Sequence, residues 1–226
     1  MSADAATATA LSPAAAGRQY TLAKIGSFVG LVPAGIWTAF HLWHQLAAFN
    51  GPDAWARSVT EFPNRDGELV GLGLLLLFIV WHIVWGFRRM RLGKPNGYQY
   101  LGNARWWLQR ITALGLFFFI GAHVWLAKLE PLVETGRPET FQDLAAHMAH
   151  HAPTLFVYIL GVAAVAYHLG NGLWNFCFSF GIVTSQRGLA WTTRVALLVV
   201  ALLLVIGWLA VYALWHAGQP FPAPLD

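Results

Sequence analysis

The stretch Leu160–Arg187 reads LGVAAVAYHLGNGLWNFCFSFGIVTSQR, and it decides how the rest of the chain is interpreted. It is apolar and aromatic over more than the roughly 20 residues that an α-helix needs to cross a bilayer. His168 lies inside this run, and Gly170 and Gly172 follow it. An ionisable side chain in the hydrocarbon region is costly unless something binds it, so His168 is a candidate functional residue.

The composition of the whole chain is that of an integral membrane protein. Of its 226 residues, 57% are hydrophobic and only 11% are charged, whereas about a quarter of the residues in soluble domains are charged. We therefore expect no separate soluble domain. The net charge of +4 reports the orientation of the loops rather than a nucleic-acid partner. The single cysteine, Cys177, excludes a disulfide framework and a cysteine metal site.

Five segments are long and apolar enough to span a membrane, and they predict an all-α integral membrane fold, an up-down bundle of five transmembrane helices. The segments are approximately 25–48, 68–90, 106–128, 153–180 and 192–215.

The remaining residues fall into two tails and several loops. Residues 1–20 are expected to form a flexible N-terminal tail, because the Ala-rich start lacks the basic and apolar regions of a secretory signal. Residues 21–217 then form the transmembrane domain, and residues 218–226 form an external C-terminal tail. Asp53 is a candidate cap for a short surface helix, and Thr140-Phe-Gln-Asp143 resembles a capping box before a short interfacial helix.

The distribution of lysine and arginine predicts the orientation of the bundle. Because five spans put the two termini on opposite sides, every loop can be assigned to one side. Ten basic residues lie on the side of the N-terminus: Arg18, Lys24, Arg88, Arg89, Arg91, Lys94, Arg105, Arg110, Arg187 and Arg194. The other side has four: Arg57, Arg65, Lys128 and Arg137. Cytoplasmic loops carry the excess of basic residues, so the N-terminus is expected in the cytoplasm.

Four predicted spans contain an internal histidine, and the depths of these histidines can be estimated from the rise of an α-helix. His41 lies roughly 22 Å and His123 roughly 25 Å from the inner face. His82 and His168 lie on spans that run in the opposite direction, roughly 9 Å from the inner face. The four histidines therefore fall into two layers, His41 with His123 outside and His82 with His168 inside.

Two histidines at equal depth on different helices can hold one haem iron from both faces, and bundle cores are where such sites are built. Two such pairs would hold two haems with their irons roughly 13–16 Å apart, a spacing that suits electron transfer. With both axial positions filled, the iron would carry electrons rather than activate a ligand. The alternative is that each histidine binds a neighbouring helix or lines a polar cavity.

The other histidines leave two questions open. His44 lies three residues after His41 on the same helix face, so it could replace His41 as a ligand or line the outer edge of the cofactor pocket. His147, His150 and His151 share one face of the expected interfacial helix. They could bind a metal or relay protons, but a solvated polar face is the favoured interpretation.

At these residues the chain resembles the di-haem cytochrome b membrane-anchor subunit of succinate dehydrogenase and fumarate reductase, in its five-helix, single-chain form. The similarity is most specific over Tyr167–Ser185, which has the family's histidine, glycines, Leu-Trp and Phe-Cys before a Gly-Ile-x-x-Ser turn. Further matches are Asn103–Thr112, Ser27–Gly35 followed by His41-Leu42, and Trp81–Gly86. The resemblance covers nearly all of residues 20–215.

The resemblance implies that His41 and His123 bind the outer haem b and that His82 and His168 bind the inner haem b. Gln45 stands where the family often has asparagine, and His44 is an additional histidine, so His44 remains an alternative to His41. The resemblance also implies partner subunits on the cytoplasmic face, a flavoprotein with FAD and an iron–sulfur protein. Electrons would pass through the haems to or from a quinone, commonly menaquinone, in a prokaryotic cytoplasmic (inner) membrane that the chain crosses several times.

Five further residues are candidates within this interpretation. Arg110 could pair with a haem propionate, although it also serves the ordinary positive-inside pattern, and Ser27 is a candidate for the vicinity of a propionate or of the quinone. Glu61, Asp66 and Glu68, at the outer start of the second span, are candidates for quinone-coupled proton exchange, or are solvated loop residues.

Two other functions remain compatible with the apolar spans and their histidines. One is a di-haem anchor of another respiratory complex, of the nitrate reductase or hydrogenase type, against which the Gly-Leu-Trp-Asn-Phe-Cys run argues. The other is a haem-free transporter or structural anchor whose histidines lie on a proton path.

Overall fold

The computed structural model describes residues 12–59, 65–92, 101–137 and 139–223. Within these ranges the chain is helical almost throughout and contains no strand. Among the residues in these ranges, five stretches are long and apolar enough to cross a membrane, which confirms the predicted five spans. They are Pro13–Asn50, Val70–Arg91, Gly102–Glu134, Ala152–Ser179 and Gln186–Gly218.

The first span is one continuous helical rod with a change of helix type in its middle. It comprises α1 (Pro13–Val29), the π-helical turn η1 (Gly30–Gly35), α2 (Ile36–Gln45) and the short 3₁₀ segment η2 (Leu46–Asn50). Pro33 lies inside η1, where it has no N–H to donate, and a wider turn accommodates its ring without breaking the rod.

The start of α1 differs from the sequence-based expectation. Residues 13–20, which we expected in a flexible tail, are helical. Ser12 caps the helix, because its Oγ accepts a hydrogen bond from the Ala15 N–H at 3.3 Å. Pro13 then occupies the first helical turn, where its missing N–H has no cost, and alanines follow it.

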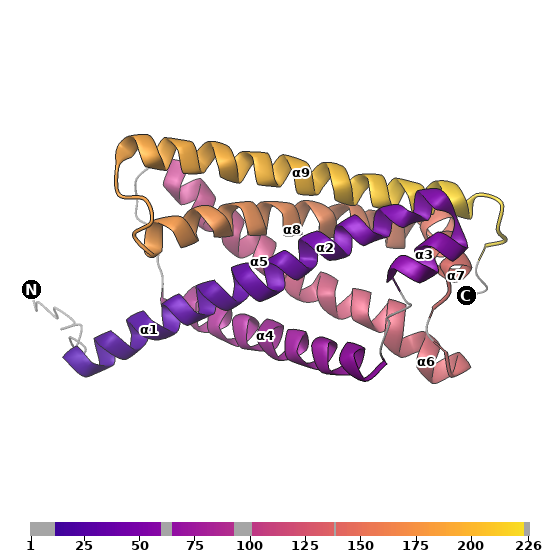
Figure 1. Cartoon of the computed structure of the whole chain (residues 1–226), viewed down its shortest axis with the longest axis horizontal. Helices are drawn as coiled ribbons and strands as arrows, with labels where there is room; N and C mark the ends of the chain where they lie inside the picture. Colours follow the sequence, from indigo (N-terminus) through magenta and orange to yellow (C-terminus); the bar gives the residue numbers. More distant parts are fainter. Residues whose placement is uncertain (1–11, 60–64, 93–100, 138, 224–226) are drawn as a thin grey trace, which may run out of the picture.

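The other spans are α4 (Arg65–Leu92), α5 (Leu101–Val124), α8 (Ala152–Ser179) and α9 (Gln186–Gly218), with the π-helical η3 (Trp125–Leu129) and α6 (Glu130–Thr135) extending α5. The five rods run along the long axis of the molecule, with α9 against α8, α8 against α5 and α1 against α4 (Figure 1). α1 begins at the end of the bundle where α8 turns into α9 (the α1 end), and α3, α6 and α7 lie at the opposite end (the α7 end) (Figure 1).

Two short helices close the α7 end, α3 (Pro52–Val59) and α7 (Phe141–His150). The predicted capping box is present, since Thr140 Oγ1 accepts from the Asp143 N–H and the Asp143 carboxylate accepts from the Thr140 N–H. Trp55 of α3 donates from Nε1 to Gln45 Oε1 at 2.8 Å. Trp55 also packs with Phe141 in a buried cluster, so α3, α7 and the end of α9 form one core.

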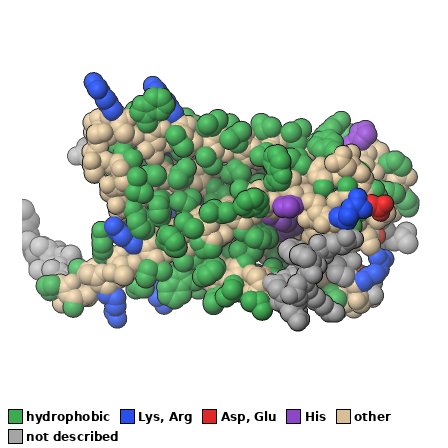
Figure 2. Space-filling model, viewed as in Figure 1, with side chains coloured by type: hydrophobic (Ala, Val, Ile, Leu, Met, Phe, Trp, Pro, Cys, Tyr) green, Lys and Arg blue, Asp and Glu red, His purple; other side chains and the backbone are tan. Residues whose placement is uncertain are grey.

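The surface that surrounds the long axis of the bundle is apolar, as contact with lipid requires. Large hydrophobic side chains are exposed on every span, among them Phe40, Leu77, Phe118, Phe156 and Leu197. Figure 2 shows hydrophobic side chains over the middle of the visible face, with Lys and Arg side chains at the ends. Charged side chains at the two ends and an apolar surface between them agree with a multi-pass membrane protein.

Candidate functional site

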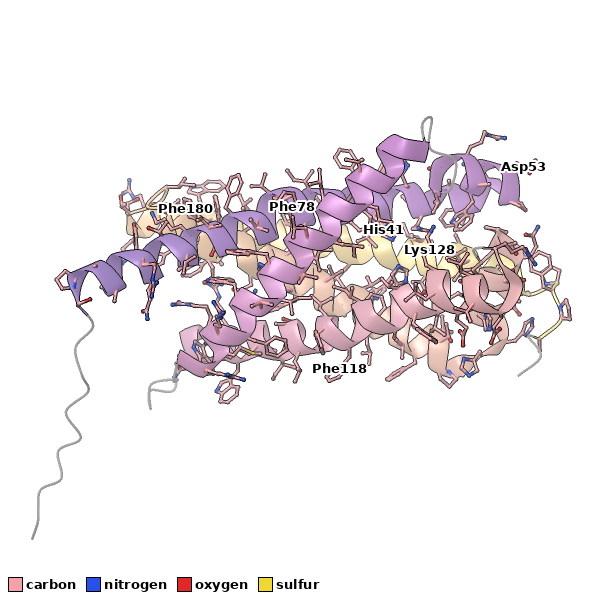
Figure 3. The ribbon with its side chains drawn as sticks, turned by 90° about the horizontal axis from the view of Figure 1, so that it is seen from below. His41, Asp53, Phe78, Phe118, Lys128 and Phe180 are labelled. Carbon is pink, nitrogen blue, oxygen red and sulfur yellow. The ribbon has the colours of Figure 1, made fainter. Side chains whose placement is uncertain are left out.

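The structure brings the four span histidines together in two pairs. His41 of α2 and His123 of α5 have ring centroids 6.0 Å apart, with an interplanar angle of 68°. His82 of α4 and His168 of α8 have ring centroids 6.2 Å apart, at 86°. These are the pairs that the depth estimate predicts. The His41–His123 pair lies toward the α7 end, and in Figure 3 His41 and Lys128 are both in the half of the molecule that holds Asp53.

The separation within each pair fits two imidazoles on one metal ion. A bond from an imidazole nitrogen to a metal is about 2 Å long, and the ring centre lies about 1 Å beyond the nitrogen, so two opposed ligands have centroids about 6 Å apart. Both pairs have this separation. Neutral imidazoles supplied by facing helices of a bundle are suitable axial ligands for haem iron.

His82 is oriented by the backbone of α1. Its Nδ1 lies 3.0 Å from the Gly26 carbonyl oxygen, and donation from Nδ1 to this oxygen leaves the lone pair of Nε2 free for a metal. The first span approaches α4 closely at this point because Gly26 of α1 and Gly30 of η1 have no side chain. A Cβ at Gly30 would overlap the His82 ring, and one at Gly26 would overlap the indole of Trp85.

This close approach leads to a prediction for Gly30. Replacement by alanine should push the His82 ring out of line with His168 and lower the content of the haem that this pair would bind, because bundle interiors have little free volume. The matched control is Gly73→Ala on α4, where an added Cβ meets nothing within 4 Å. Haem per purified chain, measured by absorbance, checks the prediction, which fails if both variants retain the wild-type content.

His41 and His123 have different neighbours. His123 Nδ1 lies 2.9 Å from the Tyr158 hydroxyl oxygen of α8, which can accept its proton and again leave Nε2 free. Phe119 stacks on His123 at 5.8 Å between centroids, and Trp37 stacks on His41 at 4.7 Å. Tyr158 is a site residue that sequence reasoning missed. The one feature of the sequence that could have pointed to Tyr158 was its hydroxyl group within an apolar span.

His168 lies in a small network of amide and hydroxyl groups. Gln109 Nε2 is 3.2 Å from His168 Nδ1 and donates to the His168 carbonyl oxygen at 3.3 Å. Gln109 Oε1 in turn accepts from Asn171 Nδ2 at 2.7 Å, and Thr112 Oγ1 lies 3.4 Å from His168 Nδ1. Gln109 and Asn171 belong to the quoted motifs, but the sequence did not reveal that they contact His168.

His44 does not take part in the pairing with His123. Its Nδ1 lies 2.8 Å from the Ser58 hydroxyl of α3, and its side chain is exposed. A cavity of about 300 Å³ adjoins it, lined by Trp43, His44, Leu46, Ala47, Asn50 and Ser58. The geometry therefore places His41 beside His123 and His44 at the edge of an open cavity.

Arg110 carries a buried polar atom without a partner. Its guanidinium lies over the Trp106 ring, 3.4 Å from the centroid, and Nη1 donates to the Trp106 carbonyl oxygen. Its Nε is buried and has no hydrogen-bond partner among the described residues. Ser27 follows Gly26, the residue that binds His82, and is half-buried.

The acidic candidates are only partly described. Asp66 and Glu68 lie in the first turn of α4, and Glu61 lies outside the described residues. Of the α7 histidines, His147 contacts Glu139, and His150 Nε2 lies 2.8 Å from the Phe221 carbonyl oxygen. Among the residues that the structure describes, no three His, Cys, Asp or Glu side chains form a metal site.

Two comparisons with known proteins identify the same kind of membrane subunit. Residues 94–208, half of the chain, match the model of a family described as the succinate dehydrogenase/fumarate reductase transmembrane subunit. The succinate dehydrogenase cytochrome b558 subunit of Bacillus subtilis (strain 168) is 28% identical over 200 residues, which are 87% of this chain and 97% of that protein. The chain therefore belongs to the succinate dehydrogenase/fumarate reductase transmembrane subunit family, whose members are membrane subunits of a quinone-linked oxidoreductase complex.

Proposed function

We propose that this cytochrome b membrane subunit holds two bis-histidine haems b and carries electrons through the membrane between a partner iron–sulfur subunit and a quinone. One observation carries the proposal. In a chain of this family, two pairs of imidazoles from four different spans lie with their ring centroids 6.0 and 6.2 Å apart. Two imidazoles at this separation could together hold a haem iron.

In this proposal the haem, when bound, supplies reversible one-electron chemistry. The protein contributes orientation and exclusion of other ligands. His41 and His123 would hold one haem, and His82 and His168 would hold the other. The Gly26 carbonyl and the Tyr158 hydroxyl hold His82 and His123 by Nδ1, and such contacts fix ring orientation and raise the basicity of the ligating nitrogen.

Arg110 is the residue that we propose for a haem propionate. A guanidinium binds a carboxylate by two parallel hydrogen bonds, and the buried, unpartnered Nε of Arg110 leaves a donor available for an anion. Ser27 follows Gly26, which orients His82. It is a second candidate for a residue that lies near a propionate or near the quinone.

We infer the orientation from the basic residues of the α1 end. Arg18, Lys24, Arg105, Arg187 and Arg194 belong to the helix ends and turns that gather there, so we assign this end to the cytoplasm of a prokaryotic cell with the chain in its cytoplasmic membrane. The flavoprotein with FAD and the iron–sulfur subunit would dock on this face. The His82–His168 pair is then the inner one, and the His41–His123 pair is the outer one.

The cavity beside His44 is the place that we propose for a quinone, commonly menaquinone in the di-haem form of this family. Its volume of about 300 Å³ is at the lower end of the range for ligand pockets. His44, Asn50 and Ser58 offer polar groups for the quinone oxygens, and Trp43 offers an apolar wall. Glu61, Asp66 and Glu68 remain candidates for proton exchange on this side. Family membership leaves the nitrate reductase, hydrogenase and transporter alternatives without specific support.

A spectroscopic experiment tests the proposed function. The purified complex should show a reduced-minus-oxidised spectrum of b-type haem and low-spin, six-coordinate signals in electron paramagnetic resonance, with about two haems per chain. It should co-purify with a flavoprotein and an iron–sulfur protein. A chain that is folded in the membrane but free of haem, or that holds high-spin haem alone, would contradict the proposal.

A further inference from the structure

A buried carboxyl group at the α7 end is not used by the proposed electron path. Glu139 lies between α6 and α7, and its side chain is 9% exposed. Its Oε1 lies 3.3 Å from Nδ1 of His147, whose side chain is 42% exposed. The same Nδ1 lies 3.1 Å from the Asp143 carbonyl oxygen. His147 therefore connects the buried carboxyl to the aqueous phase, and a proton on Nδ1 can be donated to either oxygen.

The groups around Glu139 hold its proton affinity near the physiological range. Burial, together with the negative charges of Asp143 on α7 and Glu130 on α6, raises the pKa of Glu139 to about 8. Partial burial acts to raise the pKa of Asp143, but hydrogen bonds from Thr140, with Arg137 and His147 nearby, hold it below its ordinary value. Asp143 is therefore ionised when Glu139 titrates, and the proton is exchanged by Glu139.

Glu139 also lies on the side of the bundle that holds the outer histidine pair. Tyr158 of α8 packs against the buried cluster that contains Phe141, two residues after Glu139, and the Tyr158 hydroxyl lies 2.9 Å from Nδ1 of His123. From the aqueous phase toward the pair, the groups are therefore His147, Glu139, Tyr158 and His123. Within an apolar bundle, interactions between charges are stronger and less screened than in water, so a change of charge at one end of this series affects the other.

We propose that Glu139 is a proton-binding site that takes up a proton from the outer aqueous phase when the haem held by His41 and His123 gains an electron. This inference rests on the proposed function. When a haem held by His41 and His123 gained one electron from the iron–sulfur subunit or a quinol, one proton passed by His147 would convert the Glu139 carboxylate to the neutral acid, and the added charge would be balanced inside the protein. Coupling of this kind is reciprocal, and ionised Glu139 must lower the electron affinity of the outer haem.

The sign of the pH dependence follows from the pKa of Glu139. Below pH 8 the carboxyl is mostly neutral, and above pH 8 it carries a negative charge that disfavours an added electron. The midpoint potential of the outer haem should therefore fall as the pH rises through 8. The inner haem, held by His82 and His168 nearer the opposite end, should change less.

Redox titration of the intact complex at pH 6 to 9 tests the inference. We expect Glu139→Gln to lose at least half of the pH-dependent fall of the outer haem's potential while haem content and the inner haem stay unchanged. The matched control is Glu134→Gln, an exposed carboxyl on α6, which should behave like the wild type. An unchanged pH dependence in Glu139→Gln overturns the inference.

A second measurement uses the wild-type complex, in case Glu139→Gln does not assemble. Redox-difference infrared spectra near pH 8 should show a gain of protonated carboxyl on reduction, and the absence of that gain also overturns the inference. Failure of this inference can be distinguished from failure of the proposed function. If the proposed function is wrong, the wild-type complex lacks two bis-histidine haems, and this is seen before any variant is compared.

Discussion

His168→Ala and His82→Ala should each remove the inner haem and leave the outer haem assembled at least in part. Each substitution deletes one imidazole of a pair whose members come from different spans, α8 and α4. The other pair, on α2 and α5, keeps both of its imidazoles. Haem content should fall from about two per chain toward about one, with loss of one low-spin signal. Pyridine haemochrome absorbance and electron paramagnetic resonance of the purified complex measure both quantities.

The control for this pair is His151→Ala. His151 precedes the first turn of α8 and is exposed, and its Nδ1 lies 2.8 Å from Thr154 Oγ1, so its loss should leave both haems in place. Equal haem content in the wild type and in His168→Ala would reject the assignment of His168. Loss of both haems in either variant, with the chain still in the membrane, would show that the two sites do not assemble independently.

The comparison of His41→Ala with His44→Ala should show the second large effect. His41→Ala should remove the outer haem, because His41 faces His123 with ring centroids 6.0 Å apart. His44→Ala should keep both haems, since His44 contacts Ser58 and lines the open cavity. The same variant should raise the KM for quinone, because a polar group that we assign to the quinone pocket is lost.

Haem spectra of the two variants, with quinone reduction kinetics of the complex, measure these effects. Full haem content in His41→Ala, combined with a missing outer haem in His44→Ala, would make His44 the ligand and would also remove the basis for the quinone site. Ser58→Ala is a useful comparison for the kinetics, because it removes the partner of His44 Nδ1 and leaves the imidazole in place.

The pairing of the histidines could be predicted from the sequence because it depends on depth alone. The start of each apolar span and the rise per residue are properties of a single helix. They place His41 level with His123 and His82 level with His168 without any knowledge of packing. The capping box at Thr140 and Asp143 was predictable for the same reason, since both hydrogen bonds close within one turn.

The choice between His41 and His44 could not be made in this way. The two residues share a helix face, so the outcome depends on how α2 is rotated about its axis. The π-helical turn η1 at Gly30–Gly35 changes that rotation, because its turn is wider than that of an α-helix. Contacts of α3 with the end of α2, such as Ser58 with His44 and Trp55 with Gln45, also fix the rotation of α2 about its axis.

The sequence by itself determined the class of protein, the five spans and the two layers of histidines, because hydrophobicity and helical rise act locally along the chain. Only the tertiary structure decided which groups touch the histidines: the Gly26 carbonyl at His82, Tyr158 at His123 and Gln109 at His168. It also decided that Glu139 is buried. These contacts join residues far apart in the sequence, and they follow from how the helices are rotated and packed against one another, which no local pattern encodes.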